Sequence, residues 1–207
     1  MLNNFITKEI KHPLNLEDYL LLERLIKQEN SGSILASLSS NLVKRYLEIS
    51  IKSENLFFYV CEYQDKIIGY ALLAKRPLFL ISEFSVLKHS ILINLLFNLS
   101  LKTIINIILS ISKIDLFLLS KEKKIVISKN LNLNLLAINK NFQSKGIGKT
   151  FISNILDNLK KKYNFQTITV ETFDKRAGSF YENKLSFYYI GKKLRFFKNL
   201  NVYKKEL

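Results

Sequence analysis

The stretch from Leu131 to Ser153, LNLNLLAINKNFQSKGIGKTFIS, changes its hydrophobic period in the middle, and this change constrains the fold more than any other feature. Residues Leu131 to Ile138 alternate apolar and polar side chains and then become fully apolar, which predicts a strand with at least one buried face. After a polar break come two glycines, Gly146 and Gly148, and from there apolar residues recur at helical spacing. The stretch therefore predicts a strand, a glycine-containing turn and the N-terminus of a helix.

That order of elements suits an anionic ligand. The first backbone N–H groups of a helix have no intrahelical partner, and the helix dipole adds partial positive charge there. Glycine lets a ligand approach the backbone, and Lys145 and Lys149 add full charges nearby. The predicted ligand is a phosphate or pyrophosphate, with an ordinary strand-to-helix turn as the alternative. The spacing fits neither a P-loop nor the dinucleotide-binding glycine pattern.

Three segments, in this order along the chain, resemble one known family. The hairpin-like segment Phe58–Leu73 comes first, the pattern Gln143-x-x-Gly146-x-Gly148 second, and Phe180–Phe187 third. The second resembles motif A of the GCN5-related N-acetyltransferase (GNAT) superfamily. The third is similar to that family's Phe-Tyr-x-x-x-Gly-Phe segment, with one additional residue before the final pair. The resemblance covers residues 58 to 75 and 131 to 191.

The resemblance implies an α/β (α+β) fold with a mixed, mostly antiparallel sheet flanked by helices. It implies one domain of residues 1–207, with a helical hydrophobic insertion at about 77–128. The implied activity is transfer of an acetyl group from acetyl-CoA, as co-substrate, to a primary amine. An amino sugar, including a nucleotide- or lipid-linked one, and a small amine are candidate acceptors. A non-catalytic CoA-binding or membrane-associated interaction module and a longer-chain acyltransferase are the alternatives.

The resemblance also assigns the cofactor-binding residues. A bulged strand segment would pair with the pantetheine arm and offer an N–H to the thioester carbonyl, and the loop after it would hold the pyrophosphate. The strand residues are Leu136, Ala137 and Ile138, and the loop residues are Gln143, Ser144, Lys145, Gly146, Ile147, Gly148 and Lys149. Asp174 stands where the family usually has Asn, and an acid near CoA phosphates is electrostatically less favourable, although Lys175 and Arg176 could compensate. Ser186 replaces the glycine of the family's Gly-Phe pair.

Acetyl transfer to an amine requires a neutral amine, a stabilised oxyanion and a proton for the leaving thiolate. The family's tyrosine is commonly the acid, and the matching residue is Tyr181, whose phenol has an ordinary pKa of about 10. The alternative is that Tyr181 only packs or hydrogen-bonds. Glu171, on the strand before it, is the candidate base. Thr169 shares the face of Glu171 and stands where family members often have the carboxylate. A water chain could serve instead, and no metal site is predicted.

The remaining elements follow from capping residues and periodicity. We expect a first strand over Asn4–Lys11, a helix from Asn15 to Lys27, a helix from Ile34 to Ile51, a hairpin of Leu56–Glu62 and Lys66–Lys75, a helix from Gly146 to about Tyr163, a strand over Gln166–Thr172, a helix from Ala177 to Lys184, and strands over Phe187–Ile190 and Leu194–Lys204 around a turn at Gly191–Lys193.

The insertion contains an almost continuously apolar run, Val86 to Ser112. A transmembrane helix needs about 20 apolar residues, but Lys88, His89 and Lys102 interrupt this run. Three interpretations stay open: a helical lid packed on the core, a dimer surface, or an amphipathic segment (77–112) on a membrane surface. In the family that the chain resembles, acceptors usually enter where this insertion sits, so the resemblance implies that the insertion sets acceptor specificity.

Composition adds little to these predictions. The formal net charge of +15 would attract anions, but the lysines are spread along the chain and no nucleic-acid-binding motif is present, so we expect no nucleic-acid partner. The single cysteine, Cys61, cannot form an internal disulfide, and no signal peptide is recognised at the start of the sequence. We therefore expect a cytoplasmic protein, with peripheral membrane contact and a homodimer as open alternatives.

Overall fold

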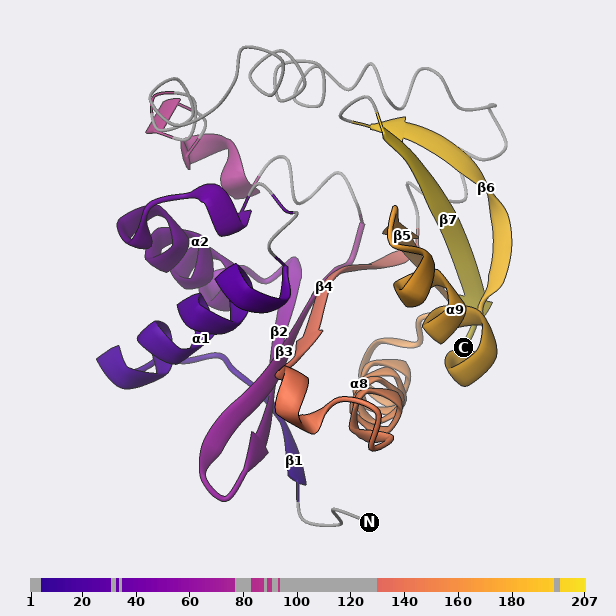
Figure 1. Cartoon of the computed structure of the whole chain (residues 1–207), viewed down its shortest axis with the longest axis horizontal. Coiled ribbons are helices and arrows are strands. Elements are labelled where there is room, and N and C mark those ends of the chain that lie inside the picture. The colour runs from indigo at the N-terminus through magenta and orange to yellow at the C-terminus, as the bar shows by residue number, and fades with distance from the viewer. Residues whose placement is uncertain are drawn as a thin grey trace.

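The fold is organised around one sheet (Figure 1). The computed structural model describes residues 5–30, 33, 35–76, 83–87, 89–90, 93, 130–195 and 198–207. In this part of the chain seven strands pair in the order β1-β2-β3-β4-β5-β7-β6, and every pair is antiparallel except β4 with β5. The strands are β1 (Phe5–Glu9), β2 (Leu56–Tyr63), β3 (Lys66–Ala74), β4 (Leu131–Ile138), β5 (Thr167–Thr172), β6 (Tyr188–Arg195) and β7 (Lys198–Glu206).

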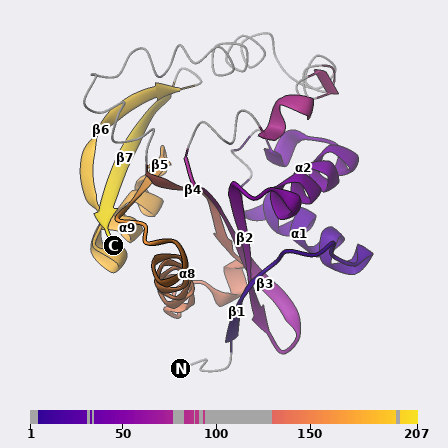
Figure 2. The same ribbon diagram turned by 180° about the vertical axis from the view of Figure 1, so that it is seen from behind.

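Two pairs of helices cover the two faces of the sheet, as Figures 1 and 2 show from opposite sides. They are α1 (Leu16–Glu29) and α2 (Ser40–Lys52) on one face, and α8 (Ile147–Tyr163) and α9 (Lys175–Leu185) on the other. Neighbouring residues of β2 point into different buried clusters: Phe58 and Val60 pack with α1 and α2, whereas Phe57 and Tyr59 pack with α8. The central strands are buried on both faces, which explains their unbroken apolar runs.

Local signals set the ends of several elements as predicted. The Asn15 side chain accepts the N–H of Asp18 at 2.8 Å and so caps α1. Gln64 and Asp65 both have left-handed backbone angles, with φ of 49° and 57°. Such a two-residue turn matches the twist of the strands that it joins, so β2 and β3 form the predicted hairpin.

The predicted helix from Ile34 to Ile51 was wrong in its first turns. A 3-10 turn at Leu35–Ser37 comes first, and α2 begins only at Ser40, with Ser39 as its N-cap residue. The Ser39 side chain makes no capping hydrogen bond, but the Ser33 hydroxyl accepts the backbone N–H of Ala36 at 3.2 Å, a local bond of the kind that favours turns over helix interiors. The α9 helix also begins earlier than predicted, at Lys175, because Asp174 caps it.

The C-terminal hairpin turn was also predicted in the wrong place. Strand β6 continues through Gly191 to Arg195, and β7 begins at Lys198. The register between these strands shifts just before Gly191, whose φ is +149°. A glycine inside a strand often marks a bulge, and the freedom of Gly191 serves a bulge here instead of a turn.

Most of the predicted insertion lies outside the described residues. Its described start, a 3-10 turn at Phe84–Leu87, packs on α2: the rings of Tyr46 and Phe84 stack at 4.1 Å, and Leu87 is fully buried. Among the described residues, no helix has both the length and the apolar character that a membrane crossing requires. Whether the insertion is a lid, a dimer surface or a membrane contact stays a prediction.

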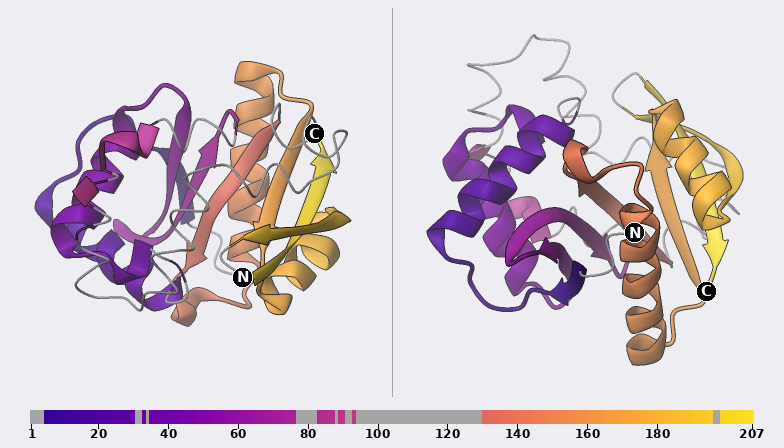
Figure 3. Two further views of the ribbon diagram at one scale, coloured as in Figure 1. Left: turned by 90° about the horizontal axis from the view of Figure 1, so that it is seen from above. Right: turned by 60° about the horizontal axis from the view of Figure 1, so that its bottom comes forward.

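Strand β4 joins the two halves of the sheet over only part of its length. It pairs with β3 from Asn132 to Ile138, but its parallel ladder with β5 ends at the pair Leu133–Val170. The strands then part, and in the right view of Figure 3 helix α8 stands between β4 and the half formed by β5, β7 and β6. Five residues of β4 therefore have one edge without a strand partner in the described sheet.

Candidate functional site

The turn between β4 and α8 presents a row of backbone amides without acceptors. Helix α8 begins at Ile147 with Gly146 as its N-cap, and no side chain caps its first turn. Earlier in the loop a backbone amide already has an acceptor, since the Lys140 N–H donates to Glu29 Oε1. From Ser144 to Lys149, no described residue accepts a hydrogen bond from a backbone N–H. Successive unpaired amides at a helix N-terminus form an anion-binding site.

The two glycines of this turn have different roles. Gly146 has a φ of +81°, and a Cβ added to it would meet no atom within 4 Å, so this residue faces open space. A Cβ on Gly148 would lie 3.5 Å from the Phe180 ring and 3.7 Å from Ile138, which are ordinary contacts. Gly146 is therefore the position that needs glycine for its backbone angle, and it leaves the amide row accessible to a ligand.

Gln143 organises the loop through its side chain. Its Nε2 donates to Glu29 Oε2 at 2.9 Å and to the Ile138 carbonyl oxygen at 2.7 Å. Its Oε1 lies 3.5 Å from Nη2 of Arg176, which comes from α9. A cofactor would therefore have to compete with these protein groups for the Gln143 side chain. Sequence reasoning missed Glu29, because it lies at the end of α1, 114 positions away, and no local pattern links the two.

The other predicted loop residues surround the amide row. Ile147 is buried and anchors the helix start in the core. Ser144 is exposed and left-handed, with a φ of +61°. The Lys145 ammonium turns back and donates to the Asn141 carbonyl oxygen at 2.9 Å, whereas Lys149 is exposed in the first turn of α8. Lys149 thus adds positive charge beside the amides.

The open edge of β4 supplies a second row of backbone groups. The N–H of Asn139 donates to the carbonyl of Ile68 on β3 at 2.8 Å. Since backbone groups alternate sides along a strand, Ala137 N–H also faces β3, and the N–H groups of Leu136 and Ile138 face the gap. Two of the three predicted strand residues therefore offer their amides to the gap between β4 and β5.

The bulge of β4 lies earlier than predicted. The register between β3 and β4 shifts at Asn134, which is left as the extra residue, so the prediction of a bulge at Leu136–Ile138 was wrong. That segment pairs regularly because Gly69 of β3 lets the strands come close. A Cβ on Gly69 would lie 2.7 Å from the carbonyl oxygen of Ala137 and would overlap the Ile138 side chain.

Helix α9 carries the predicted acid. Tyr181 is buried, with the rings of Phe187 and Tyr203 at 5.6 Å and 6.4 Å. Burial, and then the charge of Asp174, raises the pKa of the Tyr181 phenol. The phenol is protonated at neutral pH, as an unperturbed phenol also is, and its raised pKa makes it a weaker acid than a free phenol. Asp174 itself caps α9, with Oδ1 accepting Arg176 N–H at 2.7 Å, and its predicted cofactor contact stays a prediction.

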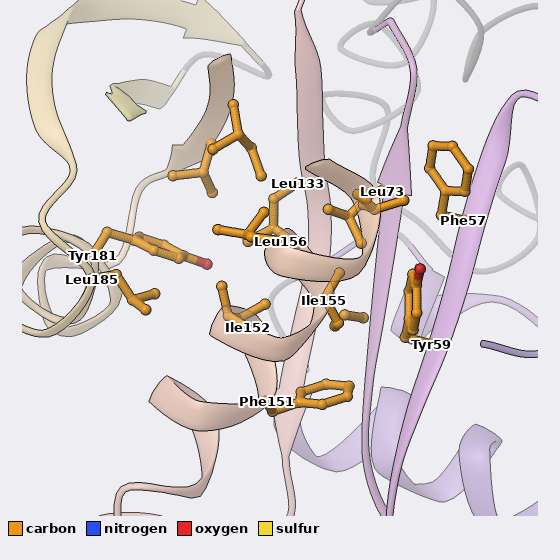
Figure 4. Close-up of a cluster of buried hydrophobic side chains, with 14 of the residues drawn as sticks. Phe57, Tyr59, Leu73, Leu133, Phe151, Ile152, Ile155, Leu156, Tyr181 and Leu185 are labelled. Atoms are coloured by element: carbon orange, nitrogen blue, oxygen red, sulfur yellow. The ribbon is translucent and has the colours of Figure 1, made fainter. Parts of the chain in front are cut away.

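The Tyr181 side chain crosses from α9 toward β4. It belongs to the same buried cluster as Leu133, Ile152 and Leu156. Figure 4 shows the hydroxyl directed toward these residues of β4 and α8. Leu133 is the last residue of β4 that pairs with β5, so the pair Leu133–Val170 closes one end of the gap between these strands. The Tyr181 hydroxyl is directed toward this closed end.

Glu171, the candidate base, lies in an ion pair. Lys193 Nζ is 3.2 Å from its Oε1, and the two side chains are only 4% and 11% exposed. To act as a base, Glu171 would have to leave Lys193, so this role stays a prediction. Thr169, on the same face, is hydrogen-bonded to Asn132 at 3.0 Å. The sequence contained no clear signal for Asn132, since Asn132 and Asn134 both fit the alternating pattern of β4 and only the structure shows that Asn132 is buried.

The single cysteine is not a nucleophile. Cys61 is fully buried, and burial together with the charge of Glu62 raises its thiol pKa to about 12. A thiol in such surroundings is unreactive. A covalent intermediate on Cys61 is therefore not expected.

Comparison with known proteins places the fold. No family model matches the sequence, and no curated protein matches it either. Solved structures do match over nearly the whole chain. Mosquito arylalkylamine N-acetyltransferase like 5b is 13% identical, with 99% of this chain and 100% of that one covered and a TM-score of 0.62.

Two bacterial structures match similarly. A Desulfovibrio desulfuricans protein assigned to the acetyltransferases of the GNAT family is 12% identical, with coverages of 98% and 99% and a TM-score of 0.58. The ribosomal-protein-S18-alanine N-acetyltransferase of Escherichia coli is 11% identical, with coverages of 98% and 94% and a TM-score of 0.56. These matches confirm the predicted fold: the chain has the fold of the GNAT superfamily.

Proposed function

We propose that this protein is an N-acetyltransferase that moves an acetyl group from acetyl-CoA to a primary amine. The observation that carries the proposal is the uncapped N-terminus of α8, which opens directly onto the unpaired edge of β4. The open space at Gly146 and the amides from Ser144 to Lys149 fit a pyrophosphate. The gap-side amides of Leu136 and Ile138 fit the amide groups of a pantetheine arm.

The residues of the chain then have distinct tasks. Bound acetyl-CoA would supply an activated acetyl thioester at the closed end of the gap. Gap-side N–H groups of β4 would orient the arm. The amine nitrogen would form its bond to the acetyl carbon, and the Tyr181 hydroxyl would give its proton to the sulfur as the carbon–sulfur bond breaks and CoA leaves as the thiol. The attacking amine must lose a proton, to Glu171 or to water. The apolar cluster around Tyr181 keeps water from the thioester.

The first test is calorimetric titration with acetyl-CoA and with CoA, using a matched pair of variants. Asn and Asp both tolerate left-handed backbone angles, so Gly146→Asn and Gly146→Asp place side chains of equal size at the mouth of the amide row. Only the aspartate adds negative charge. At an effective dielectric between that of water and about 20, a charge about 4 Å from a phosphate costs roughly 1–4 kcal/mol.

We therefore expect the Asp variant to bind CoA at least about fivefold more weakly than the Asn variant, with a smaller difference at high salt. Equal affinities of the two variants would show that no anion lies at Gly146. Absence of binding by the wild type to either compound would overturn the proposed function itself.

An acceptor screen follows once binding is established. The solved neighbours are named for arylalkylamines and for a ribosomal protein alanine, so the panel should include arylalkylamines, aliphatic diamines, amino sugars and peptide N-termini. Release of CoA is read with a thiol reagent. Acetylation of one class, lost in Tyr181→Phe, supports the assignment, whereas CoA release without any acetylated amine contradicts it.

A further inference from the structure

Two polar side chains are buried in the ladder that joins the halves of the sheet. Asn132 of β4 is 4% exposed, and Thr169 of β5 is 0% exposed. Asn132 Nδ2 donates to Thr169 Oγ1 at 3.0 Å and lies 3.4 Å from the Thr169 carbonyl oxygen. Leaving one of these groups buried without a partner would cost about 1–3 kcal/mol. The hydrogen-bonded pair is called the clamp below.

The clamp lies where β4 and β5 are about to part. Asn132 and Thr169 face each other in the register, one pair before the ladder ends at Leu133–Val170. Parallel pairing is slightly weaker per residue than antiparallel pairing, and this ladder is short. In the described sheet it is also the link between β4 and the half formed by β5, β7 and β6. A side-chain bond at this point fixes where the gap begins.

The distance from the amide row to the closed end of the gap matches the length of an extended pantetheine arm. From Ile138, which contacts the loop through Gln143, to Leu133 the strand spans about 13–16 Å at 3.3 Å per residue, counted as four steps on β3 or five on the bulged β4. An extended pantetheine arm has about the same length. With a pyrophosphate at the start of α8, the sulfur reaches the point where β4 meets β5. The Tyr181 hydroxyl is directed toward the same point (Figure 4).

We infer that Asn132 is a positioning residue: through Thr169 it fixes the depth of the gap, and thereby the place of the thioester relative to Tyr181. This inference rests on the proposed function. If the ladder opened through the clamp, by the pairs Leu133–Val170 and Asn132–Thr169, the arm could sink by two residues, about 7 Å, and the phenol would no longer lie beside the sulfur. The clamp acts on the arm alone, because the amide row belongs to the other end of the gap.

The test replaces the clamp by apolar groups of similar shape. Replacing both partners of a buried hydrogen bond by isosteric apolar residues is nearly neutral for stability, so Asn132→Leu/Thr169→Val should fold. The control is Asn154→Ala, which removes an exposed Asn–Thr hydrogen bond of 3.3 Å between α8 and β1. Two ligands are titrated into each protein: acetyl-CoA, and adenosine 3′-phosphate 5′-diphosphate, which has the phosphates without the arm.

We expect the double variant to lose at least about tenfold in affinity for acetyl-CoA, while its affinity for the armless nucleotide stays within about twofold. The Asn154→Ala control should match the wild type with both ligands. A folded double variant with wild-type affinity for acetyl-CoA overturns the inference and leaves the proposed function intact. Equal weakening for both ligands also overturns it, since the effect would then come from the whole fold. A wild type that binds neither ligand overturns both.

A milder pair of variants covers the case in which the double variant does not fold. Thr169→Val removes only the hydroxyl, and Thr169→Ser keeps it. Acetyl-CoA affinity should fall in the valine variant by about threefold or more and recover in the serine variant, with the armless nucleotide unaffected. Equal affinities of the two variants for acetyl-CoA contradict the clamp.

Discussion

The packing of α9 against β7 offers a direct test of how Tyr181 is held. Gly178 of α9 faces Tyr203 so closely that an added Cβ would overlap the tyrosine hydroxyl and lie 3.1 Å from Cζ. Tyr203 is 4% exposed and has little room to move. Gly178→Ala should therefore push α9 away from the sheet, although alanine is the better helix former.

The size of the effect follows from two opposing terms. Alanine in place of glycine favours a helix by about 1 kcal/mol, whereas overpacking a tight contact costs about 1–3 kcal/mol. We expect Gly178→Ala to destabilise the fold by up to about 2 kcal/mol. Tyr203→Phe removes the overlapping hydroxyl and one weak hydrogen bond from Asn201, at 3.4 Å. In that background the alanine should be neutral or stabilising.

The assay is urea unfolding of the two single variants, the double variant and the wild type. The double-mutant cycle should give a favourable coupling of about 1–2 kcal/mol between the Gly178→Ala and Tyr203→Phe substitutions, well above the additivity error of about 0.5 kcal/mol. Turnover should follow the same pattern, since Gly178→Ala moves the helix that carries Tyr181. Additive free energies in the cycle would refute the packing argument.

Three further outcomes are expected. Tyr181→Phe should lower kcat by about 100-fold or more with CoA affinity nearly unchanged, because only the acid is lost; an unchanged kcat contradicts the acid role. Gly69→Ala should destabilise the fold by about 1–3 kcal/mol in urea unfolding, whereas Gly148→Ala, with room for its Cβ, should not. Burial raises the pKa of several phenols, so the unfolded chain loses these protons first as the pH rises above about 10. The free energy of unfolding, unaffected by these phenols below pH 10, should then fall by about 1.4 kcal/mol per pH unit for each of them, as measured by urea unfolding at several pH values with phenolate absorbance as the titration signal. The phenols with the largest increases are those of Tyr46, Tyr59, Tyr70 and Tyr181.

The elements that could be predicted are those set by local signals. Hydrophobic period and a left-handed glycine act within a few residues, so β4, the turn at Gly146 and α8 were found with nearly correct ends. The break before α2 and the position of the last turn were not, because Ser39 and Gly191 can serve a helix, a cap, a turn or a bulge. Contacts with distant elements select one of these conformations, and such contacts cannot be inferred from the local sequence pattern.

The candidate site divides along the same line. The amide row needs only a strand, a glycine and a helix start, all adjacent in sequence. The partners of Gln143, Asn132 and Glu171 come from elements far away in the chain, and they depend on strand register and helix placement. Gln143 and Glu171 were proposed as site residues from the sequence and that assignment stays a prediction, whereas Asn132 and the partners of all three residues were not foreseen.

The arrangement also explains why the site lies at the seam of the sheet. A strand buried between two partners has every N–H and C=O paired, which leaves nothing for a ligand. An outer edge strand has spare groups, but it is open to solvent and to other chains. The end of β4 combines both conditions: β3 holds one edge through Ile138, and the other edge faces a gap closed at Leu133. An extended ligand in that gap would take the place of a missing strand, with the start of α8 holding its charged end.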